Sequence, residues 1–74
     1  MNKELQHQKL IKLANMRMPF GKYNGKLLID LPEYYLVWYK NQGFPKGELG
    51  DFMQIIYEIK LNGLEHLIRP IIKK

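Results

Sequence analysis

The stretch Phe20–Lys26, FGKYNGK, decides how the chain reverses direction. Its Asn-Gly pair is the strongest short-range signal for a two-residue type I′ hairpin turn, because both central positions need positive φ and these residues tolerate it. The sequence therefore predicts an antiparallel β-hairpin over residues 17–31. The expected register pairs Tyr23 with Lys26, Lys22 with Leu27, Gly21 with Leu28, Phe20 with Ile29 and Met18 with Leu31.

The order of apolar and polar residues agrees with this register. Alternate residues of a strand share a face. One face would carry Met18, Phe20, Leu27, Ile29 and Leu31, and the other would carry Arg17, Pro19, Gly21, Tyr23, Lys26 and Asp30. Because a lone hairpin is marginal in water, we expect helices to cover its apolar face.

Three longer segments have helical patterns. Residues 3–15 form an amphipathic run of good helix formers without Gly or Pro. Pro32 suits the first turn of a second helix that runs to about Asn41. A third helix is expected from residues 46–48 to Asn62, and Pro70 limits a short last one. The third helix has a broad apolar stripe: Leu49, Phe52, Met53, Ile56 and Ile59.

These elements predict an α+β fold in which two to three further helices pack on the apolar face of the hairpin. The expected organisation is a single small domain, 1–74, with an N-terminal helix in 1–16, a hairpin over 17–31, a helical part over 32–69 and a tail over 70–74. A chain of 74 residues can bury only a small core by itself, so self-association is an alternative way for it to bury apolar surface.

Charge and composition restrict the function. Twelve basic and seven acidic residues give a net charge of +5, which favours polyanions. No apolar stretch approaches the roughly 20 residues of a membrane span, and the N-terminus has no secretory h-region. We expect a soluble, cytoplasmic protein that does not engage a membrane.

Catalytic and metal sites are not expected. The chain contains no Ser, Thr or Cys, which removes hydroxyl and thiol nucleophiles apart from tyrosine. His7 and His66 are isolated, so neither has partners at ligand spacing. Glu48 and Asp51 suit the positive end of a helix dipole. The sequence therefore predicts a protein that is not an enzyme and has no metal or cofactor.

The segment around Gly21 does not fit a nucleotide-binding loop. A P-loop needs four residues between its glycines and a hydroxyl residue after its lysine, whereas here three residues separate Gly21 from Gly25 and Leu27 follows Lys26. The hypothesis that survives is a basic hairpin tip whose amines contact phosphates and whose tyrosine stacks on a base. Its candidate residues are Arg17, Lys22, Tyr23, Asn24 and Lys26, with Lys40 and Lys46 as flanking contacts. The alternative is a solvated turn whose lysines only protect a sheet edge.

Aromatic residues cluster in the second helix, where Trp38 follows Tyr34 and Tyr35 by four and three residues. Because large rings supply much of the core of a small domain, we expect Trp38 to be buried. One helix cannot bury all of its rings on one side. Tyr34 or Tyr39 is therefore expected to face nucleic acid or a second subunit.

The segments MPFGKYNGKLLIDLPEYYLVWYKNQGFPKGELG and YEIKLNGLEHLIRP resemble, over residues 18–70, a small bacterial family of unknown function labelled putative quorum-sensing-regulated virulence factor. The same core is similar to the accessory C-terminal domain of exodeoxyribonuclease X-like proteins. In those proteins the metal-binding acidic residues belong to a separate nuclease domain, so no catalytic residue carries over. The shared turn would hold Phe20, Gly21, Lys22, Tyr23, Gly25 and Lys26, and the shared helix Pro32, Tyr35, Leu36 and Trp38.

The resemblance implies a non-catalytic accessory module that helps a neighbouring activity to engage nucleic acid. Together with the basic tip, it predicts non-specific binding of DNA or RNA. The alternative hypothesis is a protein–protein interaction domain or a homodimer, in which exposed tyrosines and the imperfect first helix form the interface.

Overall fold

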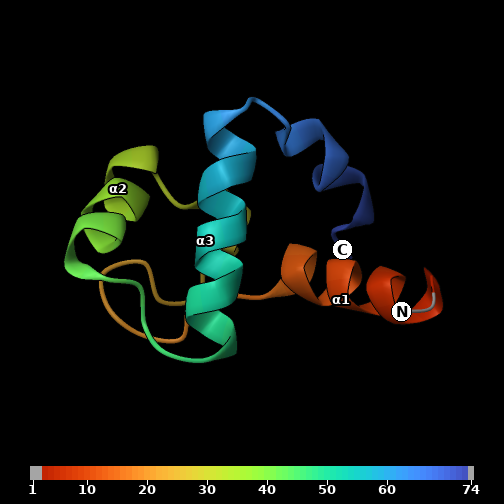
Figure 1. The fold of residues 1–74 in the computed structure, drawn as a ribbon, viewed down its shortest axis with the longest axis horizontal. Helices are drawn as coiled ribbons and strands as arrows, with labels where there is room; N and C mark the ends of the chain where they lie inside the picture. The colour runs from red at the N-terminus through yellow and green to blue at the C-terminus, as the bar shows by residue number, and fades with distance from the viewer. Residues whose placement is uncertain (1–2, 74) are drawn as a thin grey trace.

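A computed structural model describes the backbone of residues 3–73 and the side chains of residues 7–73. The helices are α1 (Lys3–Asn15), α2 (Glu33–Gln42) and α3 (Glu48–Leu61), with single 3-10 turns η1 (Leu28–Asp30), η2 (Glu65–Leu67) and η3 (Arg69–Ile71). In Figure 1, α3 stands in the middle, with α2 on one side and α1 and the C-terminal turns on the other. The described part of the chain is therefore helical.

The predicted α+β fold with a β-hairpin is wrong. Within residues 3–73, the only β pairing is one isolated antiparallel bridge between Arg17 and Leu27. Beside it, Met18 N–H donates to the Lys26 carbonyl and Gly25 N–H to the Met18 carbonyl, both at 2.8 Å. Pro19 follows Met18 directly. Because proline has no N–H to donate, the series of backbone hydrogen bonds between the two segments ends there. The intervening residues, 18–26, form a loop.

The turn itself also differs from the prediction. Gly25 has φ +89°, but no described residue other than glycine has positive φ, so Asn24 does not take the type I′ conformation. Lys26 N–H donates to the Tyr23 carbonyl at 3.0 Å, closing a turn with positive φ only at its third residue. This is the type II pattern. Unlike a type I′ turn, its backbone twist does not match the twist of the two strands of a hairpin.

The burial of the predicted hairpin residues follows from this loop. Met18, Ile29 and Leu31 are buried, as predicted, but Leu27 is only partly buried. Phe20 was placed on the apolar face and is 45 % exposed, because it lies in the loop and not in a strand. In place of a second strand, Leu28–Asp30 form η1, where Asp30 N–H donates to the Leu27 carbonyl at 2.9 Å.

The core takes residues from α1, η1, α2 and α3, and α3 contributes the most. On α3, Phe52, Met53 and Ile56 are buried as the apolar stripe predicted. Gly50 lies on the same helix, where a Cβ would be 1.6 Å from the Pro45 carbonyl oxygen. The helix therefore packs directly on the backbone of the α2–α3 connection. The buried hydrophobic residues are Leu13, Ala14, Met18, Leu28, Ile29, Leu31, Leu36, Phe52, Met53, Ile56 and Ile68.

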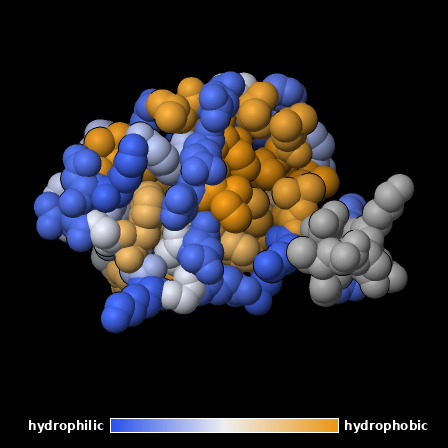
Figure 2. Space-filling view, viewed as in Figure 1, coloured by the Kyte–Doolittle hydropathy of each residue, from blue (hydrophilic) through white to orange (hydrophobic). Residues whose placement is uncertain are grey.

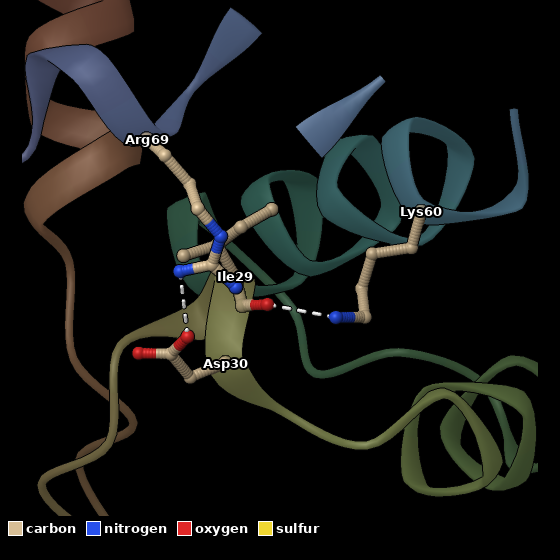
Figure 3. Close-up of polar contacts among 4 residues, drawn as sticks. All are labelled: Ile29, Asp30, Lys60 and Arg69. Carbon is tan, nitrogen blue, oxygen red and sulfur yellow. Dashed lines mark hydrogen bonds and ion pairs between the residues drawn. The ribbon is translucent and has the colours of Figure 1, made fainter. Parts of the chain in front are cut away.

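Polar contacts fasten η1 to the C-terminal half of the chain (Figure 3). Lys60 Nζ, from α3, donates to the Ile29 carbonyl at 2.8 Å, and the Arg69 guanidinium pairs with the Asp30 carboxylate at 3.0 Å. Both basic side chains therefore have a partner within the chain.

A side chain at the end of α1 joins it to the C-terminal segment. Asn15 Nδ2 donates to the Ile71 carbonyl at 3.2 Å, and its Oδ1 accepts from the Lys73 N–H at 2.7 Å. Because both polar ends of one amide are used, residues 71–73 are fixed against the last turn of α1. None of the helices in the described part of the chain is long and apolar enough to cross a membrane.

Candidate nucleic-acid interface

The loop of residues 17–27 is closed by its own hydrogen bonds. Arg17 Nη1 donates to the Gly25 carbonyl at 2.6 Å, and Asn24 N–H donates to the Gly21 carbonyl at 3.2 Å. Arg17 was predicted as a phosphate contact, and the structure places its guanidinium across the loop as a support. The basic side chains that remain on the loop, Lys22 and Lys26, are exposed.

Tyr23 attaches this loop to α2. Its hydroxyl shares a hydrogen bond with the Tyr34 hydroxyl, and its ring lies edge-on to Tyr35 with centroids 4.7 Å apart. The hydrogen bond to Tyr34, followed by desolvation, raises the pKa of Tyr23. Burial, together with Tyr39, raises the pKa of Tyr35 to about 12. Both phenols are therefore neutral near neutral pH, and neither adds negative charge to the surface.

A row of T-shaped aromatic contacts continues along α2. The centroids of Tyr35 and Tyr39 are 5.1 Å apart, and those of Trp38 and Tyr39 are 5.0 Å apart. Such edge-to-face pairs stabilise beyond the area that they bury. The rings of Tyr23, Tyr35, Tyr39 and Trp38 therefore form a series in which each ring contacts the next.

The predicted burial of Trp38 is wrong. Trp38 is 54 % exposed and Tyr34 is 62 % exposed, while Leu36 is fully buried. Successive helical residues are rotated by about 100° around the axis. Tyr34 and Trp38 are each two residues from Leu36, so they lie roughly 200° from it, on the opposite side of the helix. Of the two tyrosines expected to face nucleic acid or a second subunit, Tyr34 is exposed, whereas Tyr39 is partly buried against the core.

The structure keeps five of the predicted residues, Arg17 among them, on the loop, and places Lys40 and Lys46 elsewhere. Lys22, Tyr23, Asn24 and Lys26 share the loop, and Lys22 Nζ lies 5.5 Å from the centre of the Tyr23 ring. Lys40 lies near the C-terminal end of α2, with its amine 5.0 Å from the centre of the Tyr57 ring. Lys46 precedes α3 and is exposed, but no described contact joins it to the loop.

We call Lys22, Tyr23, Asn24 and Lys26 with Tyr34 and Trp38 the basic aromatic surface. Tyr34 and Trp38 were not among the predicted site residues. Their spacing from Leu36 could have placed them outside the core, but the contact of Tyr34 with the loop depends on tertiary structure. Among the residues that the structure describes, no cluster of His, Asp or Glu could hold a metal ion.

A groove lies on another face, between α1 and the start of α3. It has a volume of roughly 500 Å³ and is lined by Lys9, Leu10, Leu13, Gly47, Glu48, Asp51, Phe52 and Ile55. Leu10 and Ile55 are each 40 % exposed there. Figure 2 shows hydrophobic side chains gathered beside α3, on the side where α1 and the C-terminal turns lie.

Residues 6–71 match the family described as "Putative quorum-sensing-regulated virulence factor". The chain belongs to this family. The chain is also similar to two uncharacterized proteins named YpeB, from Escherichia coli strain K12 and from O157:H7. Each is 50 % identical to this chain over 68 residues, which covers 90 % of this chain and 94 % of its own length.

No solved structure matches the chain. The matched relatives are uncharacterized, so membership of the quorum-sensing-regulated family carries no mechanism. These matches do not bear on the expected similarity to exodeoxyribonuclease X-like accessory domains, which stays a prediction.

Proposed function

We propose that the protein is a non-catalytic nucleic-acid-binding module that uses the basic aromatic surface. The observation that carries the proposal is the shared hydrogen bond of Tyr23 and Tyr34, which joins the loop that carries Lys22 and Lys26 to the exposed Tyr34 ring of α2. Amines beside exposed rings match the two contacts, phosphate pairing and ring stacking, that sequence-tolerant nucleic-acid binders combine.

Charge supports the same proposal. The net charge of +5 favours approach of a polyanion, and the two ion pairs between described residues involve neither Lys22 nor Lys26. Arg17, Lys60 and Arg69 each have a partner within the chain, so they are less available to phosphate. The lysines of the loop are therefore the expected phosphate contacts.

The test is a salt-dependent titration of fluorescently labelled DNA and RNA, read by anisotropy. We expect binding at low salt that weakens as salt rises, since each phosphate contact releases counterions. Lys22→Glu and Lys26→Glu should each weaken binding, and the double variant should weaken it further. Lys73→Glu is the matched control, because it makes the same change in net charge at an exposed residue beyond η3.

Two results would reject the proposal. One is the absence of binding to any strand at low salt. The other is equal loss of affinity in Lys22→Glu and Lys73→Glu, which would mean that net charge alone, and not this loop, attracts the nucleic acid.

Self-association is a second candidate function, supported by the α1–α3 groove. Leu10 and Ile55 line it from opposite helices, and so do Lys9 and Asp51, which carry opposite charges. We propose a two-fold arrangement in which Lys9 of each copy pairs with Asp51 of the other, since contacts in an isologous interface occur twice. The proposed occupant of the groove is therefore a second copy of this chain.

Light scattering over a range of protein concentrations tests this candidate. Asp51→Lys should favour the monomer, and combination with Lys9→Asp should restore the dimer, because the pair of charges is exchanged and not removed. Gln54→Lys, at an exposed position of α3 that does not line the groove, is the control. A wild-type protein that stays monomeric at high concentration would exclude the candidate.

A further inference from the structure

Tyr34 and Trp38 form an exposed pair of rings on one face of α2. Residues four apart lie on the same side of a helix, about 6 Å apart along its axis. Each ring is also restrained by a neighbour. The Tyr34 hydroxyl is bonded to that of Tyr23, and the Trp38 ring lies edge-on to Tyr39. Two rings are therefore held outward in a fixed spacing.

We infer that this pair stacks two neighbouring unpaired bases, so that the module selects single-stranded over double-stranded nucleic acid. The inference rests on the proposed function, because it names the class of strand that the same basic aromatic surface binds. The loop lysines supply attraction to phosphate, which a duplex and a single strand share. The rings supply the contact that only exposed base faces can make.

The spacing of the rings is the physical basis of the selection. Neighbouring bases of one strand in a duplex are about 3.4 Å apart, and each covers the face of the next. Rings carried by backbone positions about 6 Å apart along a helix axis are not spaced to follow that stack. A single strand can separate its bases and place each on a ring, and such stacking tolerates any base because every base has a π face.

Charge around the pair favours this occupant over a protein partner. Tyr34 is bonded to Tyr23, and the Lys22 amine lies over the Tyr23 ring at 5.5 Å. A cation on the ring that is bonded to Tyr34 suits a strand that offers a phosphate next to each base.

The experiment compares three probes of equal length: oligothymidylate, the same sugar–phosphate strand without bases, and a duplex. Trp38 is the chain's single tryptophan, so intrinsic fluorescence reports on this position. We expect oligothymidylate to quench Trp38 and to bind roughly tenfold or more tightly than the abasic strand or the duplex. Those two probes should bind by charge alone and leave the fluorescence nearly unchanged.

Variants separate stacking from a structural role. Loss of one stacking ring is expected to weaken oligothymidylate binding by roughly 5- to 140-fold. Trp38→Leu should show this loss, whereas Trp38→Phe, which keeps a ring, should retain most of the affinity. Both changes are at an exposed side chain, so circular dichroism should show folded protein. Affinity for the abasic strand should not change in either variant.

The outcomes distinguish the inference from the proposed function. Equal affinity for all three probes, or lysine-dependent binding without quenching of Trp38, overturns the inference and leaves nucleic-acid binding intact. The aromatic pair would then be free for a protein partner. Equal loss of all three affinities in Trp38→Leu overturns it too, since the ring would be supporting the loop. Absence of binding to every probe overturns both.

Discussion

Replacement of Gly50 by alanine tests the close packing of α3 on the chain that precedes it. In an exposed helix interior, this change stabilises by about 1 kcal/mol, because alanine has the higher helix propensity. Here the added Cβ would lie 1.6 Å from the Pro45 carbonyl oxygen and must move to at least 3.0 Å. Overpacking of this kind costs about 1–3 kcal/mol. The upper value applies because the obstacle is backbone, so we expect a net loss of about 2 kcal/mol.

For a domain of this length, that loss lowers the melting temperature by roughly 8–16 °C. The assay is thermal and urea unfolding followed by far-UV circular dichroism. Gln54→Ala, at an exposed position of the same helix, is the control and should change stability by less than about 0.5 kcal/mol. A Gly50→Ala variant that melts at or above the wild-type temperature would show that α3 does not pack on Pro45.

Three further predictions concern the loop, a partly buried phenol and the contacts of η1. Gly25→Val should lower the urea midpoint, because Gly25 has φ +89° and a β-branched residue resists positive φ; an unchanged midpoint would contradict the observed turn. The pKa of Tyr35 is raised to about 12, so the folded state keeps its proton longer than the unfolded state. Stability should then be unaffected below pH 10 and fall as pH rises above it, and Tyr35→Phe should reduce that fall in urea titrations at each pH. Lys60→Met leaves the buried Ile29 carbonyl without its donor and should cost about 1–3 kcal/mol of unfolding free energy. Arg69→Met breaks an exposed ion pair and should cost less than about 1 kcal/mol, so the reverse order would contradict the assigned roles.

The helices could be predicted because their signals are local. Pro32 precedes α2 and Gly43, at φ +97°, ends it, so the observed range Glu33–Gln42 agrees with the prediction. The apolar stripe predicted for the third helix includes the large side chains that α3 contributes to the core. Capping and periodicity depend on neighbours in the chain, which a single sequence contains.

The hairpin could not be predicted reliably, because strand pairing depends on the whole segment and not on the turn alone. Asn24-Gly25 does form a turn, but Pro19 removes a donor on one side and Leu28–Asp30 coil into η1 on the other. Positive φ at Gly25 alone satisfies a type II turn. A correct turn signal thus led to a wrong fold class.

The candidate site was predicted in part. The loop residues Lys22, Tyr23, Asn24 and Lys26 are adjacent in sequence, so their proximity follows from the chain itself. Trp38 was assigned to the core on its size, although its position relative to Leu36 places it on the far side of α2. The hydrogen bond between Tyr23 and Tyr34 joins residues 11 apart, and no local pattern indicates it.

The double contact of Asn15 determines when α1 can be secured during synthesis. Its amide is satisfied by residues 71 and 73, which leave the ribosome long after α1 has been made. Until then, the apolar side of α1 lacks part of its covering, and a nascent chain exposes it to chaperones or to other chains.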